Sequence, residues 1–449
     1  MREPVERGDT RSLGWRLEQL DRLSALLEQH EPAVLEALAA DLGKPPLEAT
    51  FELVAVRQEI ALTRKQLRRW MAPRPYPLDL ALQPGRAWVE RQPLGCVLII
   101  GPWNYPFQLT LHPLVSALAA GNTVVIKPSE QAPQTAALIA RLLGEAFTPE
   151  VVRVVQGDAA VASALLEQHF DHVFFTGGGR VGSLVMQACA RHLTPVTLEL
   201  GGKSPVIVLG DADVAVTARR VAWGKGLNAG QTCIGPDHVL VEQTVREPLV
   251  AAMAQELERF YGSDPLQSPD LGQIVNDGQF QRLHGLLEGA RQRGQVLVGG
   301  RSDAEQRRIE PTLLAVDSLD DPLMQEELFG PLLPVLTIEG LEAALEQIRR
   351  RPRPLALYLF SRSAAAQRRV LEASCSGSVV FNDVVLQGGA AALPFGGVGP
   401  SGLGSYHGEA GFRTFSHERS VLRRPFLFDL PFRYPPYAGK LALVKRLLG

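Results

Sequence analysis

The chain has 449 residues, with 46 basic and 48 acidic side chains and a formal net charge of −2. This length exceeds the size at which a single hydrophobic core keeps growing, so we expect two or three domains. The near balance of charge excludes the basic surface that nucleic-acid binding requires, and the expected partner is a small molecule.

The four cysteines are Cys96, Cys189, Cys233 and Cys375. They lie too far apart for a metal knuckle and are too few to crosslink a chain of this length, so no metal site is predicted and a reducing compartment is expected. The N-terminus is charged from Arg2 onward and lacks the apolar stretch of a secretory signal. These features predict a cytoplasmic protein.

Taken in chain order, apolar residues at helical spacing predict helices between Leu13 and Trp70, which the prolines from Pro73 onward bring to an end. The stretch 78–92 is then predicted to be an extended segment, and we interpret it as an arm. The uncharged segment between Arg91 and Lys127 is interrupted by prolines and glycine, so we interpret it as buried core and not as a membrane span.

Beyond the arm, short apolar runs alternate with helical stretches, both before and after Cys233. This rhythm is typical of βαβ units and of a parallel sheet that is covered on both faces. The sequence therefore predicts an α/β fold with two domains in tandem. The expected strands are Cys96–Ile100, Thr123–Ile126, Val151–Val155 and Val173–Phe175, followed by Val239–Val241, Leu332–Leu336, Leu355–Phe360 and Val379–Phe381.

Cys233 and Glu199 are the first candidates for chemistry. A lone cysteine is more often a small buried residue than a nucleophile. The stretch Asn228–Gln231 before Cys233, however, is unusually small and polar, and its glycine lets the backbone come close to a ligand. Glu199 ends an apolar strand and precedes two glycines, which is where open α/β sheets bind ligands.

A glycine-rich turn after a strand is the second candidate. Gly177, Gly179 and Gly182 match G-x-G-x-x-G, and Glu199 lies near the offset at which an acid holds a ribose. A plain strand-to-helix turn is about as good an interpretation. In either case the amides at the helix N-terminus could face a pyrophosphate.

Asn104 is the third candidate, because it stands between Pro102 and Pro106 directly after the first strand of the sheet. Such an asparagine is usually a turn residue. Its amide is also a donor that could serve an oxyanion, and the local sequence leaves both roles open.

Together these motifs resemble the aldehyde dehydrogenase superfamily, from about Leu47 to Phe432. The string Leu393–Gly408 and the closing Arg433–Tyr437 resemble its class 3 branch, which includes fatty aldehyde and coniferyl aldehyde dehydrogenases. The tail Lys440–Leu448 is too short and too charged to span a membrane. The motifs that carry the resemblance are Gly101–Pro106, Lys127–Glu130, Phe175–Gly182, Leu198–Pro205, Gln231–Cys233, Glu327–Pro331 and Pro394–Gly397.

The resemblance implies oxidation of an aldehyde to a carboxylic acid through a thioester, with NAD or NADP as cofactor. It makes Cys233 the nucleophile and Asn104, with the N–H of Cys233, the oxyanion hole. It also assigns Glu199 to catalysis, as the base that activates water, in place of ribose binding. Because a free cysteine is mostly protonated at neutral pH, we expect the site to lower the pKa of the thiol through neighbouring positive charge, helix dipoles or the cofactor's nicotinium ring. The cofactor-binding residues that it implies are Trp103, Lys127, Glu130, Gly177, Gly182, Glu327 and Phe329.

The implied fold is that of an aldehyde dehydrogenase, with two Rossmann-type parallel-sheet α/β domains and a small β oligomerisation arm. A homodimer is expected, with at most weak peripheral membrane contact through the tail. The expected substrate is a medium- or long-chain aliphatic or an aromatic aldehyde. The expected parts are a nucleotide-binding domain at 1–76 and 93–200, a catalytic domain at 201–413, the arm at 77–92 and 414–430, and the tail at 431–449.

Two alternatives stay open at this point. One is a reductive or CoA-acylating relative, in which a base such as Glu199 would have less purpose. The other is a non-catalytic protein that has kept the fold, and the presence of Cys233, Glu199 and Asn104 argues against it.

Two features bear on the cofactor. The glycines at 178 and 179 depart from the family pattern, which has bulkier polar residues there. The acid at Glu130 should disfavour a cofactor with a 2′-phosphate by charge repulsion.

Overall fold

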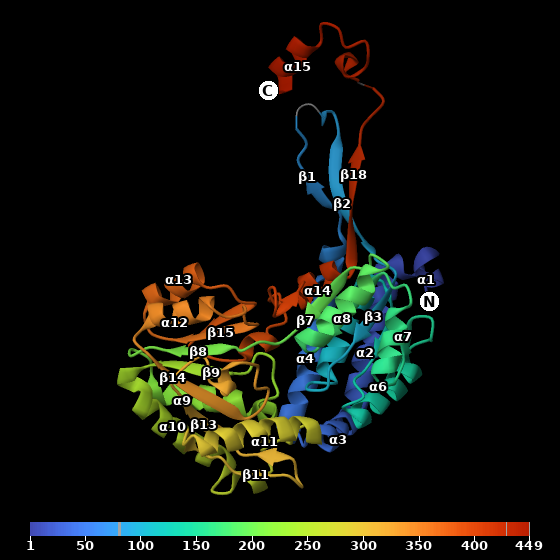
Figure 1. Ribbon diagram of the computed structural model, residues 1–449. Helices are drawn as coiled ribbons and strands as arrows, with labels where there is room; N and C mark the ends of the chain where they lie inside the picture. Colours follow the sequence, from blue (N-terminus) through green and yellow to red (C-terminus); the bar gives the residue numbers. More distant parts are fainter. Residues whose placement is uncertain (80–81, 428, 449) are drawn as a thin grey trace.

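The computed structural model describes residues 1–79, 82–427 and 429–448. Two open sheets, each covered by helices, form the body of the molecule, and a narrow three-stranded sheet projects away from it (Figure 1). This is the α/β architecture that the alternating apolar runs predict. Short elements outside these sheets include α1 (Glu3–Glu6), β11 (Ser302–Asp303) and β12 (Arg308–Ile309).

The first sheet is made of β3 (Cys96–Ile100), β4 (Thr123–Lys127), β5 (Val152–Val154), β6 (His172–Thr176), β7 (Val196–Glu199) and β17 (Gly402–Leu403). Its strand order is β17-β7-β6-β3-β4-β5, and only β17 runs antiparallel to its neighbour. Along β3, Val97 and Ile99 belong to one buried cluster and Leu98 to another. This alternation is that of a strand buried on both faces.

The helices of this unit lie on the two faces of the sheet. One face is covered by α2 (Leu13–Gln29), α3 (Glu31–Leu42), α4 (Pro46–Met71), α5 (Gln108–Ala120) and α6 (Pro133–Ala146), and the other by α7 (Ala159–Leu166) and α8 (Gly179–Ala190). The helical region predicted from Leu13 to Trp70 is thus three helices. Gly43, with a left-handed φ of 60°, ends α3, and Pro45 and Pro46 begin α4.

The second sheet is made of β8 (Pro205–Val208), β9 (His238–Glu242), β10 (Val296–Val298), β13 (Thr312–Val316), β14 (Leu332–Ile338), β15 (Ala356–Phe360) and β16 (Ser378–Phe381). The order is β10-β13-β14-β9-β8-β15-β16, and all neighbours are parallel except β10 and β13. One face is covered by α9 (Val214–Gly226), α10 (Gln243–Tyr261) and α11 (Asp277–Gln292), and the other by α12 (Leu341–Arg349) and α13 (Ala364–Ala373).

The segment 402–413, which lies within the predicted range 201–413 of the catalytic domain, packs on the first sheet. Within it, β17 pairs with β7, and Phe412 of α14 (Gly408–Thr414) packs in the core beside α4 and α5. The local pattern of apolar residues does not reveal this return, because it fixes the type of an element and not its partner.

The projecting sheet consists of β1 (Arg74–Tyr76), β2 (Arg86–Pro93) and β18 (Ser416–Arg423), with β2 in the middle and all pairs antiparallel. Strands far apart in the chain thus build the arm that the sequence predicts, and α15 (Leu441–Leu448) lies past its tip (Figure 1). Residues 80, 81, 428 and 449 of the predicted arm and tail lie outside the described residues. None of the helices in the described ranges is long and apolar enough to cross a lipid bilayer.

Candidate active site

Two cavities meet at Cys233. One, of about 560 Å³, is mostly apolar and is lined by aromatic side chains such as Phe51, Tyr105 and Trp223. The other, of about 940 Å³, is also lined by Cys233 and by residues at the ends of strands of the first sheet. The thiol therefore stands where an apolar chamber and a larger, more polar chamber join.

The loop that carries Cys233 has an unusual backbone. Asn228 and Ala229 have left-handed φ values of 53° and 52°, and Gly230 has a φ of 75°. A Cβ at Gly230 would lie 2.2 Å from the carbonyl oxygen of Gly330, so only glycine fits there. The side-chain amide of Gln231 donates to the carbonyl oxygens of Asn228 and Gln273, at 3.0 and 2.9 Å. These bonds hold the loop that presents the thiol.

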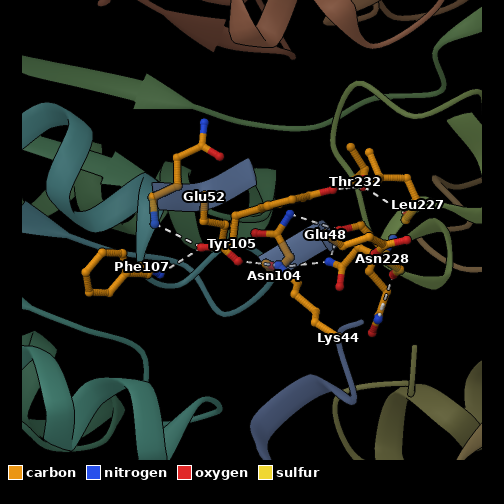
Figure 2. A network of polar contacts seen from close by, with 11 residues as sticks. Lys44, Glu48, Glu52, Asn104, Tyr105, Phe107, Leu227, Asn228 and Thr232 are labelled. Atoms are coloured by element: carbon orange, nitrogen blue, oxygen red, sulfur yellow. Dashed lines mark hydrogen bonds and ion pairs between the residues drawn. The ribbon is translucent and has the colours of Figure 1, made fainter. Parts of the chain in front are cut away.

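Asn104 lies in the loop between β3 and α5, and the fold brings it to the loop of Cys233. Its side-chain nitrogen donates to the carbonyl oxygen of Gln231 at 3.1 Å. Its own carbonyl oxygen accepts from Lys44 Nζ at 2.9 Å and from Asn228 Nδ2 at 2.8 Å (Figure 2). The amide nitrogen carries two hydrogens, and among the described residues only Gln231 accepts one of them, so the other is available to a ligand.

Glu199 is the last residue of β7, and its side chain lines the same chamber as Cys233. It is only 3% exposed, and within the described residues neither carboxylate oxygen has a hydrogen-bond partner. Burial raises the pKa of this carboxyl well above its usual range. An unpaired, buried carboxyl beside a thiol is suited to accept a proton from water.

The pKa of Cys233 differs from the prediction. Burial, followed by the nearby carboxyls of Glu327 and Glu199, raises it to about 12. The expectation that the site lowers this pKa is therefore wrong for the groups that the chain itself supplies. Among the described residues, only the backbone N–H groups of Ile234 and Cys233 lower this pKa, and no cationic side chain does, so positive charge from a bound molecule would favour the thiolate.

The glycine turn borders the polar chamber where α8 begins. The helix starts after Gly178 without a side-chain cap, which leaves its first amides available to an anion. A Cβ at Gly178 or Gly179 would meet nothing within 4 Å, whereas at Gly177 or Gly182 it would lie 2.6 or 2.7 Å from a neighbouring side chain. Side chains therefore pack tightly against Gly177 and Gly182, and the turn between them has room for a pyrophosphate.

Lys127, the last residue of β4, and Glu130, just beyond it, also line this chamber. Lys127 Nζ donates to Glu130 Oε2 at 2.8 Å and to the carbonyl oxygen of Pro128 at 2.9 Å. An ammonium and a carboxylate at the ends of parallel strands are suited to hold the hydroxyl groups of a ribose. The structure thus brings together in one chamber the predicted contacts from both ends of a dinucleotide.

Glu327 and Phe329 enter the chamber from the second sheet. The rings of Phe329 and Trp103 meet edge to face, with centroids 5.2 Å apart. Burial, followed by the charge of Asp237, raises the pKa of Glu327 to about 8. A Cβ at Gly201 would lie 2.1 Å from the Glu327 carboxylate, so the glycine after Leu200 makes room for this acid.

Lys203 and Asp237 form a buried ion pair that holds the segment around Glu327 in place. Lys203 Nζ also donates to the carbonyl oxygens of Leu323 and Glu326, both at 2.9 Å, and Asp237 Oδ1 accepts from the N–H of Leu328 at 2.8 Å. Lys203 thus has a structural task that its place in the predicted motif did not reveal.

Three residues that hold the loops of Asn104 and Asn228 were not predicted from the sequence, namely Lys44, Glu48 and Glu52 (Figure 2). A signal for them exists. Glu48 and Glu52 are one helical turn apart, on the same stretch of α4 as the buried Ala49 and Leu53. Acids at helical spacing among core residues indicate buried partners.

A thiol at the junction of an apolar chamber and a dinucleotide-sized chamber, with an unpaired carboxyl and an amide donor lining the larger of the two, defines an oxidoreductase that acts through a cysteine. Within the described ranges, no three His, Cys, Asp or Glu side chains are grouped as a metal site would need.

Comparison with known proteins names the class. The aldehyde dehydrogenase family profile matches residues 8–421. Aldehyde dehydrogenase family 3 member H1 of Arabidopsis thaliana is 46% identical, covering 100% of this chain and 93% of its own. A Canis lupus familiaris relative named "aldehyde dehydrogenase, dimeric NADP-preferring" is 43% identical over 97% and 96% of the two chains. A substrate-bound structure of Staphylococcus aureus AldH has a TM-score of 0.96 and 42% identity, covering 100% of this chain and 98% of that one.

The chain therefore belongs to the aldehyde dehydrogenase family. It is an NAD(P)-dependent oxidoreductase that oxidises aldehydes, and the predicted fold class, activity and resemblance to the class 3 branch are confirmed.

Proposed function

We propose that the chain oxidises a medium- or long-chain aliphatic or an aromatic aldehyde to the acid through a thioester on Cys233. The observation that carries this proposal is the position of Cys233 between the two chambers, with Asn104 hydrogen-bonded to its loop and Glu199 in the same chamber. Aromatic side chains such as Phe51 and Trp223 line the substrate chamber, which supports an apolar substrate.

In the first step the Cys233 thiolate adds to the carbonyl carbon. A C–S bond forms, and the π electron pair moves to oxygen, where the free N–H of Asn104 and the N–H of Cys233 stabilise the negative charge. When bound, NAD or NADP supplies the nicotinamide ring that accepts a hydride. Departure of hydride from the tetrahedral carbon restores the C=O bond and leaves the thioester on Cys233.

In the second half Glu199 takes a proton from water as the water oxygen attacks the thioester carbon. The C–O bond forms, the C–S bond breaks, and the electron pair returns to sulfur, which releases the acid. The unpaired carboxylate oxygens of Glu199 support this role.

The residues that would hold the cofactor come from both sheets. We propose that Lys127 and Glu130 bind the adenosine ribose, that the turn from Gly177 to Gly182 faces the pyrophosphate, and that Glu327 binds the nicotinamide ribose. Trp103 and Phe329 would enclose the chamber between them. The unit built on the first sheet would then be the nucleotide-binding domain, and the unit built on the second would be the catalytic domain.

For the whole molecule we propose a cytoplasmic homodimer that forms through the arm of β1, β2 and β18. The four cysteines are all free thiols, which supports a reducing compartment. The dimeric relative supports the assembly. In α15 the exposed Leu441 lies near Lys445 and Arg446, which supports weak contact with an anionic membrane surface and no insertion.

Absorbance of reduced cofactor tests the activity. Mixing the protein with NAD or NADP and a series of aldehydes should give turnover that does not depend on CoA. Strict dependence on CoA would establish the acylating alternative, and no turnover with any aldehyde would establish the non-catalytic one.

A further inference from the structure

Lys44 and Glu52 form an ion pair with no exposure to solvent, directly behind the loop of Asn104 (Figure 2). The three directions open to the Lys44 ammonium are all used. It donates to Glu52 Oε1 and, at 2.9 Å, to the carbonyl oxygen of Asn104, and it lies 3.9 Å from the centre of the Tyr105 ring. The lysine therefore has no free donor for a ligand, and its contacts all lead to one loop.

The other oxygen of Glu52 holds the far end of the same loop. Oε2 accepts from the backbone N–H groups of Phe107 and Gln108, at 3.1 and 2.9 Å, where α5 begins. One carboxylate thus caps this helix and also binds the lysine that holds Asn104. The loop between β3 and α5 is fixed at its middle and at its end by a single buried pair.

Stability alone does not account for this pair. Taking two charges out of water costs free energy that their attraction often fails to recover, and apolar replacements of buried pairs are commonly neutral or stabilising. The loop could be packed by apolar side chains, but these would not fix the direction of the Asn104 peptide group as a charged donor does. The pair therefore serves the position of this loop more than the stability of the core.

A second link from α4 reaches the loop of the thiol. The backbone N–H of Asn228 donates to Glu48 Oε2 at 2.8 Å. The side-chain nitrogen of Asn228 then bridges the carbonyl oxygens of Asn104 and Gln231, at 2.8 and 3.1 Å. Residues in and next to the start of one helix thus hold both the amide donor and the segment that leads into Cys233.

We propose that Lys44 and Glu52 are positioning residues for the reaction, which fix the Asn104 amide at the point where the negative oxygen forms. They act through Asn104 and touch neither substrate nor cofactor. The inference rests on the proposed function, because it requires Asn104 to donate to that oxygen.

Hydrolysis of 4-nitrophenyl acetate by the full chain without cofactor isolates this effect. An activated ester forms the same kind of oxyanion when a thiolate attacks it, and release of nitrophenolate reports acylation. Glu52→Gln has the size of glutamate, but its NH₂ group must face either Lys44 or the two N–H donors of α5, so one anchor is lost. We expect Glu52→Gln and Lys44→Met each to slow acylation by about tenfold to a hundredfold, the effect of misplacing a reacting group.

Asp41→Asn is the matched control. Asp41 is another buried carboxylate that caps a helix, since it accepts from Gln134 and Thr135 at the start of α6, at 3.0 and 2.8 Å. Its substitution should cost comparable stability and leave the acylation rate nearly unchanged. Equal slowing in Asp41→Asn would show a general loss of structure and would overturn the proposal.

The Asn104→Ala background gives the decisive comparison. If Lys44 and Glu52 act through the Asn104 amide, their variants should lose most of their effect on acylation in this background, since the group that they position is gone. The same fold-loss in both backgrounds would overturn the inference. Unchanged acylation in Asn104→Ala by itself would instead show that the proposed oxyanion role is wrong. Should Lys44→Met fail to fold, Glu52→Gln carries the same comparison.

Discussion

The hydroxyl groups of Tyr105 and Thr232 lie 2.7 Å apart, and they belong to the residues that directly follow Asn104 and directly precede Cys233. One residue comes from the loop after β3 in the first sheet, and the other comes from the loop after α9 beside the second sheet. The two halves of the active site are therefore joined by the neighbours of the reacting groups. This arrangement leaves the thiol and the amide free for the substrate while it sets the distance between them.

Cys233→Ala should abolish aldehyde oxidation, because no other cysteine lies in either chamber. Folding and cofactor binding should persist, and both can be followed by circular dichroism and by cofactor fluorescence. Cys375→Ala is the matched control, since this thiol is exposed and away from the site. Substantial activity in Cys233→Ala would end the thioester mechanism.

Glu199→Gln should separate acylation from deacylation. The amide cannot take a proton from water, so we expect a burst of reduced cofactor close to one equivalent of enzyme. Steady turnover should then be slower by about 10²–10⁴-fold. Rapid mixing with absorbance detection measures both phases. A normal steady rate with a raised cofactor KM would instead assign Glu199 to the ribose, as the glycine motif by itself suggested.

The raised pKa of Cys233 predicts how the free enzyme reacts with iodoacetamide. Only the thiolate reacts, and burial and two carboxyls hold its pKa near 12. The alkylation rate should therefore rise about tenfold per pH unit between pH 7 and 10 and reach no plateau. Bound NAD brings a positive ring, which should increase the rate at neutral pH. A plateau near pH 8.5 without cofactor would contradict this assignment. Cys375→Ala protein keeps the exposed thiol from obscuring the result.

The arm predicts a dimer in solution. Phe426 and Leu427 follow β18 and are fully exposed in the single chain, at 108% and 95%, and a partner subunit would cover such apolar groups. Light scattering at micromolar concentration should give twice the chain mass. Phe426→Asp combined with Leu427→Asp should shift the protein toward monomer, whereas Leu193→Asp, at a residue 90% exposed on the body, should not. A monomeric mass for the unaltered protein would contradict the arm interface.

The C-terminal helix predicts weak, salt-sensitive binding to membranes. Lys445 and Arg446 should draw α15 to anionic lipid, and the apolar contact is too small to hold it there without charge. Co-sedimentation with vesicles of phosphatidylserine should exceed that with phosphatidylcholine and should disappear in high salt. Binding that only detergent reverses would show that the tail inserts more deeply.

The sequence was sufficient for the fold class and for the main candidates. Strands such as β3 and β6 are short apolar runs bounded by turns, so their type follows from local composition. The motifs around Asn104, Glu199 and Cys233 stand at recognisable positions, and in the structure all three residues line the larger chamber. The return of residues 402–413 to the first sheet was missed, because a two-residue strand and a short helix carry little periodic signal.

The amino-acid sequence by itself determined which residue types follow which strands. Those residue types in turn indicated the chemistry of a thiol, a carboxyl and an amide. Only the tertiary structure decided how those groups affect one another. The pKa of Cys233 is raised because burial and the carboxyls of Glu327 and Glu199 act on it together, and neither burial nor distance can be read along the chain. The same holds for Lys44, whose neighbour Asn104 lies 60 positions away in sequence and 2.9 Å away in space. Electrostatic effects depend on separation and dielectric, which exist only once the chain has folded.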